Sequence, residues 1–189
     1  MNDLIKSPTR KPDVPEEIQV RWQRIVDLMA GVLGVPAGLI MRVDSPQLEV
    51  LVSSATDGNP YRKGERAELN TGLYCETVMR RRSPLLVPDA LKDPKWDHNP
   101  DIKLGMTFYL GYPVTWPDGE VFGTICILDG KDNSCATQFR GLISEFQQVI
   151  ERDLRLMIEA HEREGLLAEV QRHRDQLKEM VAEKTSELE

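Results

Sequence analysis

The sequence predicts an α+β fold built on a mainly antiparallel β-sheet, and three observations indicate it. Residues 108–128 contain two apolar arms, rich in aromatic and β-branched residues, on either side of Trp116-Pro117-Asp118-Gly119. Pro and Gly at these places are typical of a tight turn, so the segment is expected to form a central β-hairpin. Both arms are too apolar for a sheet with one wet face, and helical patterns at both ends of the chain supply candidate covering layers.

The N-terminal helix is expected to begin near Pro15, after a polar arm over residues 1–14. Glu16 and Glu17 complement the helix dipole in the first turn, and Gly34 ends the pattern. The apolar stripe of this helix recurs at spacings of three and four residues: Ile18, Trp22, Ile25, Met29 and Val32. Such a stripe is typical of a helix with one buried face.

A second hairpin is predicted from residues 38–43 and 48–54, which read as strands joined by the turn sequence of residues 44–47. Residues 57–66 are polar and contain two glycines and a proline, so they are expected to form a loop.

A short helix is predicted over residues 73–82, with its start marked by Asn70 or Thr71. Residues 85–87 form a very short strand or extended segment. Residues 88–105 then make the longest irregular stretch of the chain, and loops of this length inside a compact domain are often functional.

From about Thr137 the sequence is helical nearly to its end. Its first part carries a broad apolar face suited to packing on a sheet: Phe139, Leu142, Ile143, Phe146, Val149, Ile150, Leu154 and Met157. After His161 the apolar residues follow alternating steps of three and four: Leu167, Val170, Leu177, Val181 and Leu188. Arg174 and Lys184 fill the remaining core positions, which predicts a weak two-stranded coiled coil. We therefore expect a flexible arm over residues 1–14, a domain over 15–160 and a coiled-coil signalling linker over 161–189.

The composition favours a soluble globular protein, with 40% hydrophobic and 29% charged residues. A net charge of −7 without a basic stripe argues against a nucleic-acid partner. No apolar run approaches the roughly 20 residues of a spanning helix and no signal peptide opens the chain, so no membrane insertion is expected. Three cysteines without a CxxC pair favour reduced thiols and a cytoplasmic location.

The middle of the chain resembles a GAF domain in four blocks that follow the order and spacing of that family. The blocks are residues 72–78 (GLYCETV), 86–90 (LVPDA), 109–114 (YLGYPV) and 123–129 (GTICILD). The resemblance covers roughly residues 15–157. It implies a central sheet with the N- and C-terminal helices on one face and a ligand pocket on the other.

The tail over residues 174–189 resembles the coiled-coil linkers of bacterial sensor proteins. Such linkers lead into a histidine kinase of a two-component system, a diguanylate cyclase or a further sensor domain. The resemblance therefore implies a fragment of a longer signalling protein, a homodimer through its terminal helices, covalently linked to an output domain that this chain lacks.

A regulatory module that senses a small molecule or a redox event is the function that the resemblance implies, and no enzymatic activity is expected. One alternative is a thiol enzyme like the free-methionine sulfoxide reductases, using Cys75. Another is a dimerisation spacer with an empty pocket. The cofactor stays unknown, because cyclic nucleotides, haem, bilins and small metabolites all bind within this family.

Cys75 is the first candidate ligand-binding residue, because a position near a helix start lowers a thiol pKa. Free-methionine sulfoxide reductases carry a cysteine at a similar place, but they need a partner thiol in the long loop, which contains none here. Bilin-binding relatives usually have His after the attachment cysteine, where this chain has Glu76. A small buried core residue is the other interpretation. Cys126 is expected in the core and Cys135 in an exposed turn.

Trp96 and His98 are candidates because the equivalent loop lies over the ligand pocket in the family. A lone His among carboxylates lacks metal-site spacing, so no metal is expected, and the alternative is a structural loop held by Trp96. Tyr109 and Tyr112 complete the candidate set. Strand alternation sends Tyr109 to one sheet face and Phe108 and Tyr112 to the other, without indicating which face meets the pocket.

Overall fold

The computed structural model describes residues 11–133 and 138–186, with side chains described to residue 184. A six-stranded sheet has the order β3-β2-β1-β6-β5-β4, and every neighbouring pair is antiparallel. The strands are β1 (Ala37–Asp44), β2 (Gln47–Ser53), β3 (Arg66–Glu68), β4 (Leu85–Val87), β5 (Phe108–Thr115) and β6 (Val121–Asp129). The helices are α1 (Glu16–Leu33), α2 (Tyr74–Arg81), α3 (Arg140–Ser186) and two 3₁₀ turns, η1 (Ala90–Lys92) and η2 (Pro100–Leu104). The predicted α+β class is confirmed.

The hairpin predicted from residues 108–128 is the β5–β6 pair. Its turn closes with a hydrogen bond of 2.9 Å from the Gly119 N–H to the Trp116 carbonyl, and Gly119 takes a φ of 84°. That left-handed conformation costs glycine little because it has no Cβ. On its other edge β6 pairs with β1, so β1 and β6 lie at the centre of the sheet.

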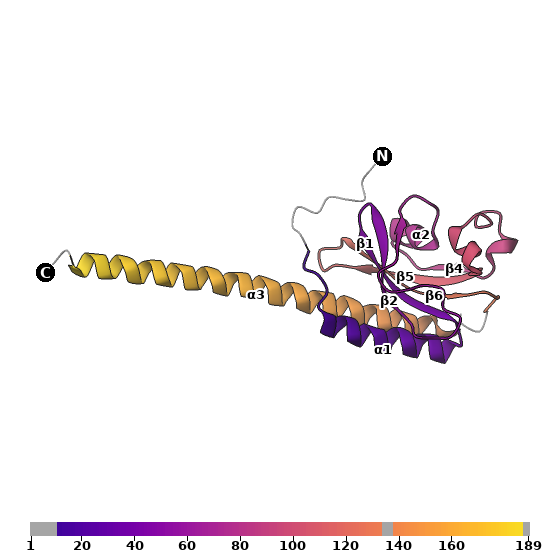
Figure 1. Ribbon diagram of the computed structural model, residues 1–189, viewed down its shortest axis with the longest axis horizontal. Helices are drawn as coiled ribbons and strands as arrows, with labels where there is room; N and C mark the ends of the chain where they lie inside the picture. Colours follow the sequence, from indigo (N-terminus) through magenta and orange to yellow (C-terminus); the bar gives the residue numbers. More distant parts are fainter. Residues whose placement is uncertain (1–10, 134–137, 187–189) are drawn as a thin grey trace.

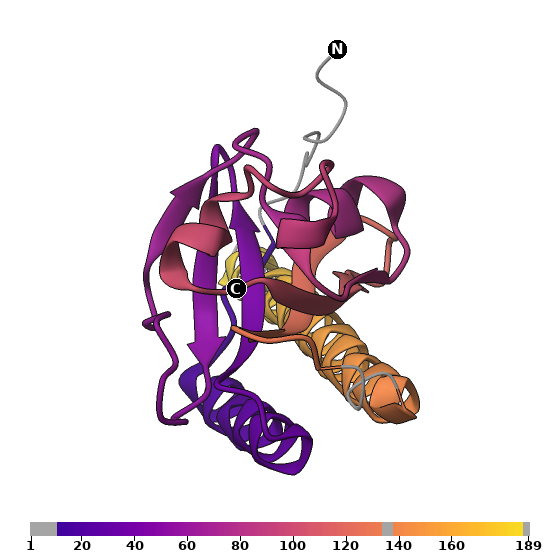
Figure 2. The ribbon, with the colours of Figure 1, turned by 90° about the vertical axis from the view of Figure 1, so that its right-hand side faces the viewer.

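Helices cover the two faces of the sheet unequally. The terminal helices α1 and α3 lie side by side against one face, here called the helix face, while α2, η1 and η2 lie over the opposite cavity face (Figures 1 and 2). Alternate residues of each strand point to opposite faces, which divides the core into two clusters. On the helix face, the Trp22 indole N–H of α1 donates to Asp153 of α3 at 2.8 Å, and both residues are buried.

The apolar stripe predicted for α1 is shifted around the helix in the structure. Val32 is 51% exposed, whereas the buried residues are Trp22, Val26, Met29, Ala30 and Leu33. These positions follow steps of four, three, one and three residues. The buried face is therefore rotated about the helix axis relative to the predicted stripe, with which it shares Trp22 and Met29. In α3, Val149 of the predicted apolar face is likewise 40% exposed.

Two short elements differ from the prediction. Residue 66, predicted to end a loop, begins β3, a three-residue edge strand paired with β2. Neither Asn70 nor Thr71 caps α2; the carboxylate of Glu76 instead accepts hydrogen bonds from the N–H groups of Thr71, Gly72 and Leu73, at 3.1, 3.2 and 3.3 Å. Glu76, a residue inside the helix, therefore satisfies the backbone N–H groups of the segment that leads into the helix.

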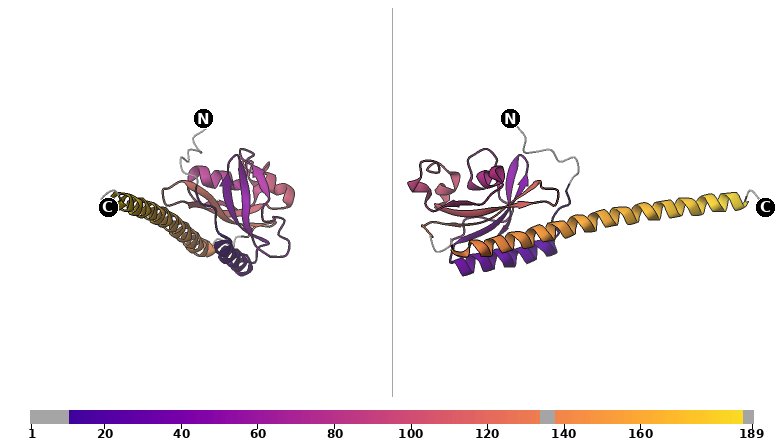
Figure 3. Two further views of the ribbon diagram at one scale, coloured as in Figure 1. Left: turned by 60° about the vertical axis from the view of Figure 1, so that its left-hand side comes forward. Right: turned by 180° about the vertical axis from the view of Figure 1, so that it is seen from behind.

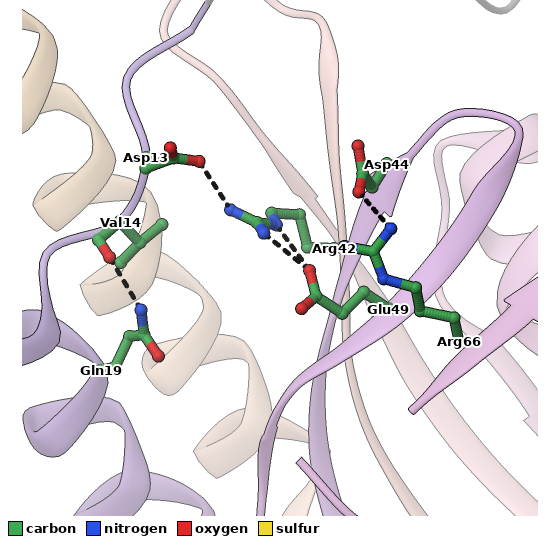
Figure 4. A network of polar contacts seen from close by, with 7 residues as sticks. All are labelled: Asp13, Val14, Gln19, Arg42, Asp44, Glu49 and Arg66. Atoms are coloured by element: carbon green, nitrogen blue, oxygen red, sulfur yellow. Dashed lines mark hydrogen bonds and ion pairs between the residues drawn. The ribbon is translucent and has the colours of Figure 1, made fainter. Parts of the chain in front are cut away.

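The chain before α1 is held to the sheet by polar contacts (Figure 4). Arg42 of β1 pairs with Glu49 of β2 at 2.6 Å and reaches Asp13 at 3.3 Å. The Gln19 side-chain amide donates to the Val14 carbonyl at 2.8 Å. These contacts fix the start of α1 beside the β1–β2 hairpin.

Beyond the sheet, α3 continues as one helix far past the rest of the molecule (Figures 1 and 3). The predicted heptad residues Leu167, Val170, Leu177 and Val181 are all exposed in this single chain, and Leu188 lies outside the described residues. None of the helices in the described part of the chain combines the length and apolar character of a membrane span.

Candidate functional site

A cavity of about 320 Å³ lies on the cavity face of the sheet. Its floor comes from alternate residues of three neighbouring strands: Leu39, Met41, Leu48, Val50, Cys126 and Leu128. The two-residue period of a strand puts these side chains on one face, opposite to the helices α1 and α3. We call this space the sheet cavity.

The other walls of the sheet cavity come from segments that cross above the strands. Leu73 and Cys75 contribute from the start of α2, Asp101 and Leu104 from η2, and Tyr61 from the loop before β3. Residues far apart in the sequence therefore meet at one place, and an apolar floor faces a wall that holds polar groups.

Asp101 is the ionisable carboxylate that the sheet cavity encloses. Its side chain is buried, the residue being 8% exposed, and its Oδ1 accepts a hydrogen bond of 2.8 Å from the Tyr61 hydroxyl. Burial raises the pKa of Asp101 from 3.8 to about 6, although the Tyr61 hydrogen bond acts in the opposite direction. Burial, together with the nearby Asp101 charge, also raises the pKa of Tyr61, so its hydroxyl stays protonated and donates.

The η2 turn that carries Asp101 is anchored by Asn99. The Asn99 Oδ1 accepts from the Asp101 N–H at 2.9 Å, and its side-chain amide donates to the Gly72 carbonyl at 2.7 Å. The wall holding Asp101 is thus tied directly to the segment that leads into α2.

The open side of the sheet cavity is charged. Glu65 and Arg66 line it and are both exposed, and Arg66 pairs with Asp44 of β1 at 2.8 Å (Figure 4). Charged side chains at the mouth stay hydrated, whereas Asp101 inside does not. Asp101 is therefore the residue of the site whose negative charge most needs a partner.

Cys75 and Cys126 both line the sheet cavity as free thiols, and they lie close enough to affect each other's ionisation. The Thr124 hydroxyl donates to the Cys75 Sγ at 3.3 Å, and the Tyr109 hydroxyl lies 3.4 Å from the same sulfur. The neighbouring Cys126 thiol, together with the two hydroxyls, lowers the pKa of Cys75 against the opposing effect of burial. The neighbouring Cys75 thiol and burial raise the pKa of Cys126.

The position of the Tyr109 hydroxyl depends on a glycine. Gly111 lies directly opposite Cys126 in the β5–β6 ladder, and a Cβ added at residue 111 would lie 2.1 Å from the Tyr109 Oη. The ring also stacks on Tyr74, with a centroid separation of 4.9 Å and an interplanar angle of 28°. Tyr109 is therefore held over the strand pair with its hydroxyl at the thiols.

The structure places the five predicted ligand-binding residues very differently. Cys75 lines the sheet cavity. Tyr109 does not line the cavity, but its hydroxyl contacts the Cys75 sulfur. Trp96 is buried against Tyr74, with ring centroids 5.4 Å apart, and His98 is exposed and pairs with Asp97 at 2.8 Å. Neither of these two loop residues lines the cavity, because the loop folds Trp96 inward as an anchor and turns His98 to solvent.

Tyr112 needs the clearest correction. It lies in the helix-face cluster with Phe108, whereas Tyr109 lies in the cavity-face cluster. The alternation predicted for these three residues is confirmed, and it removes Tyr112 from the cavity side of the sheet.

Sequence reasoning missed three features of the cavity. Asp101 lies in the long loop that the sequence marked as functional, but nothing distinguished it from neighbouring carboxylates; Tyr61 gave no signal at all. Cys126 was predicted as a core residue, and it is fully buried, yet it also borders the cavity. Cys135 lies outside the described residues. Among the described residues, no group of three or more His, Cys, Asp or Glu side chains is placed to hold a metal ion.

An antiparallel sheet with two terminal helices on one face and a cavity on the other defines an α+β domain with a pocket on one side of its sheet. The chain matches the family model of the GAF domain over residues 17–150, which is well over half of its length. It therefore belongs to the GAF domain family. A search of curated proteins found no match.

Solved structures show the same fold at low sequence identity. The free methionine-R-sulfoxide reductase of Neisseria meningitidis aligns with a TM-score of 0.62 and 12% identity, over 75% of this chain and 80% of that chain. The PixJ GAF domain of Thermosynechococcus elongatus, in its blue-light absorbing form, aligns at 0.59 with 18% identity, over 83% and 94%. The GAF domain of an Acinetobacter phosphoenolpyruvate-protein phosphotransferase aligns at 0.55 with 18% identity, over 78% and 85%. These likenesses concern the fold alone.

Proposed function

We propose that this chain is a regulatory GAF domain that binds a small molecule in the sheet cavity and signals through α3. The observation that carries the proposal is the cavity itself, with a volume of about 320 Å³, a largely apolar floor and one buried carboxylate. Binding sites for small molecules have this size and this combination of apolar walls with few polar groups. No residue set for catalysis is proposed with it.

The chemistry of the cavity selects a class of ligand. An apolar body would cover Leu39, Val50 and Leu128, while a cationic or N–H donor group would meet Asp101. A charged carboxylate in an apolar cavity is costly without a partner, and a ligand cation supplies that partner. We therefore expect small amines with an apolar body to bind better than alcohols of the same shape.

Transmission runs through the sheet to the opposite face. The Glu151 carboxylate of α3 accepts hydrogen bonds from the Thr115 N–H at 2.9 Å and from its hydroxyl at 2.8 Å, at the end of β5. A ligand that draws η2 and α2 together favours one arrangement of the strands beneath them, and α3 passes that preference on. We propose that residues 161–189 form a parallel coiled coil in a cytoplasmic homodimer and lead to an output domain of the histidine kinase or diguanylate cyclase type.

A first experiment compares native with denaturing mass spectra of freshly purified protein and records its absorption spectrum. Extra mass that is lost on denaturation identifies a bound ligand, and extra mass that survives identifies a covalent adduct. A spectrum in the visible range separates a chromophore from a colourless metabolite.

A second experiment uses benzylamine and benzyl alcohol as probes of Asp101, with titration followed by calorimetry or NMR. We expect the amine to bind more tightly above pH 6, and Asp101→Asn to weaken it about 10-fold or more, as loss of a hydrogen bond to a charged group predicts. Asp97→Asn is the matched control, since Asp97 is an exposed carboxylate in the same loop. Equal binding of both probes, or equal effects of both variants, would reject the assigned ligand class.

Thiol catalysis is a second candidate function, because Cys126 provides Cys75 with a neighbouring thiol that the long loop does not supply. Reduction of free methionine sulfoxide with a thiol reductant, lost in Cys75→Ser, would support it. Without such turnover the regulatory function stands alone.

A further inference from the structure

We propose that Cys75 and Cys126 form a redox-active dithiol, which closes to a disulfide when a hydroperoxide enters the sheet cavity. This modification site goes beyond ligand binding and does not depend on it. A single buried cysteine would be an ordinary core residue, but two neighbouring thiols that line one cavity, from α2 and β6, are a different arrangement.

The geometry around the pair favours reaction at Cys75. Thr124 lies two residues before Cys126 on the same face of β6, and its hydroxyl donates to the Cys75 sulfur at 3.3 Å. The Tyr109 hydroxyl lies 3.4 Å from that sulfur on the other strand of the hairpin. Burial keeps the pKa of Tyr109 well above its ordinary value, so this hydroxyl remains a donor to a Cys75 thiolate.

The neighbourhood also explains how the two cysteines divide the reaction. The Cys126 thiol and the hydroxyls of Thr124 and Tyr109 lower the pKa of Cys75, whereas the Cys75 thiol and burial raise that of Cys126. The sulfur with the greater thiolate character attacks first, and the protonated neighbour resolves. Cys75 is thus the attacking residue and Cys126 the resolving residue.

The chemistry balances with a peroxide as the oxidant. The Cys75 thiolate attacks one peroxide oxygen; the S–O bond forms, the O–O bond breaks, and the leaving hydroxide takes the former thiol proton as water. The Cys126 sulfur then attacks the Cys75 sulfenic acid; the S–S bond forms, the S–O bond breaks, and a second water carries away the Cys126 proton. Two thiols are oxidised by two electrons, and hydrogen peroxide is reduced to two waters.

Closure of this bond would tie α2 to β6 at the end of the cavity that Leu73 and Leu128 also border. The tie restricts the same movement of α2 that ligand binding uses. Oxidation therefore offers a second input to the domain through one structural element.

The test uses the full chain treated with hydrogen peroxide under native conditions, followed by non-reducing digestion and mass spectrometry. Trypsin cuts after Arg66, Arg80, Lys103, Lys131 and Arg140, which places Cys75, Cys126 and Cys135 in three different peptides. We expect one cross-linked species that joins the Cys75 and Cys126 peptides, lighter by two hydrogen atoms than their sum and reversed by dithiothreitol. A Cys135→Ser background removes the remaining thiol.

Three variants test the assigned roles, and the first of them keeps both cysteines. Thr124→Val keeps the size of a fully buried side chain but removes the hydroxyl that donates to Cys75. The rate of disulfide formation should fall on the order of 10-fold, as expected from one unit of thiol pKa. Cys126→Ser should leave a Cys75 sulfenic acid that a dimedone probe traps, whereas Cys75→Ser should leave nothing for the probe at residue 126.

Certain results would overturn the proposal. Both thiols could stay free at a peroxide concentration that oxidises the same chain in urea. Alternatively, Cys75 could pair only with Cys135 or with a second chain. Either result shows that Cys75 and Cys126 do not form a redox-active pair, and both are read on the Thr124-intact protein, which needs no core substitution.

Discussion

The two faces of the sheet use similar side chains for different ends. The helix face is closed by fully buried residues of the sheet, such as Phe122 and Ile127, and of the helices that cover it, such as Trp22 of α1. The cavity face has equally apolar strand residues, but α2 and the 3₁₀ turns above them leave about 320 Å³ unfilled. Dense packing on one side allows loose packing on the other, because the helix face alone holds the terminal elements to the sheet.

Two buried carboxylates, one on each face, also differ, because one has a charged partner and the other has none in the described part of the chain. On the helix face, Asp153 is buried but paired, accepting from the Trp22 indole at 2.8 Å and from Arg21 at 2.9 Å. On the cavity face, Asp101 has only a neutral hydroxyl, that of Tyr61, as its side-chain donor among the described residues. The carboxylate of the helix face therefore has a charged partner, whereas that of the cavity face has none within the residues that the structure describes, which is why the proposed ligand cation is assigned to Asp101.

The largest effect is expected where a single step along β6 changes the face. Ile127 points to the helix face and Leu128 to the cavity face, and both are almost fully buried. Ile127→Ala should lower the free energy of unfolding by about 2–5 kcal/mol, because it creates a void in a closed core. Leu128→Ala should cost about 1 kcal/mol less, because the side chain already lacks partner atoms on one side. Urea denaturation of both variants measures the difference.

Equal losses at residues 127 and 128 would contradict this contrast, since they would mean that the cavity face is as closely packed as the helix face. Val20→Ala is the control for a general effect of shortening aliphatic side chains. Val20 is exposed on α1 and should change stability by about 0.5 kcal/mol or less.

The next effect concerns the pH dependence of stability through Asp101. Its pKa is raised from 3.8 to about 6 by burial, so the folded state binds the proton more tightly than the unfolded state. The contribution to stability is therefore fully present below about pH 4 and is lost as pH rises through about 6, by roughly 2–3 kcal/mol. Asp101→Asn should remove this loss and stabilise the ligand-free domain at neutral pH.

The measurement is the difference in unfolding free energy between the wild type and Asp101→Asn across pH 4 to 8. Taking this difference cancels the contributions of the other carboxylates to the pH dependence, because these carboxylates are present in both proteins. Glu65, Arg66, Tyr61 and Cys75 also line the cavity, and they are present in both proteins. A difference that stays flat over this range would show that Asp101 is solvated in the folded state.

The sequence was sufficient for the fold because the strands and helices carry strong local signals. The turn around Gly119, the β5–β6 arms and the opposite faces of Tyr109 and Tyr112 all follow from residue type and alternation. It failed at β3, whose three residues form a strand only because the edge of β2 is available to pair with them. The buried face of α1 is also set by its contacts with β1, β2 and α3, which no local pattern contains.

The site was less predictable, because its residues come from separate segments. Cys75 was predicted as a candidate from its place near a helix start, but its neighbour Cys126 has the pattern of an ordinary alternating strand residue. Trp96 and His98 were chosen as the most distinctive side chains of the long loop, while Asp101 reached the cavity through the η2 turn. Which of several loop carboxylates becomes buried depends on how the loop folds over the sheet.

The smallest effect on the folded domain, and the sharpest test of the proposed coiled coil, concerns the exposed part of α3. Arg174 and Lys184 interrupt the predicted apolar heptad positions, and Arg174 pairs there with the neighbouring Asp175 at 3.3 Å. Replacing both with Leu should raise dimer affinity on the order of 10-fold or more in sedimentation equilibrium, because each adds buried apolar surface to the seam. The domain lies far from these residues, so its unfolding should not change. Arg172→Leu is the matched control for Arg174→Leu, since it makes the same substitution two residues away on the opposite side of the helix. A gain of affinity in both single variants would indicate unspecific association of an apolar helix, and a gain in neither would remove the coiled-coil assignment, leaving α3 without a partner to read the state of the cavity.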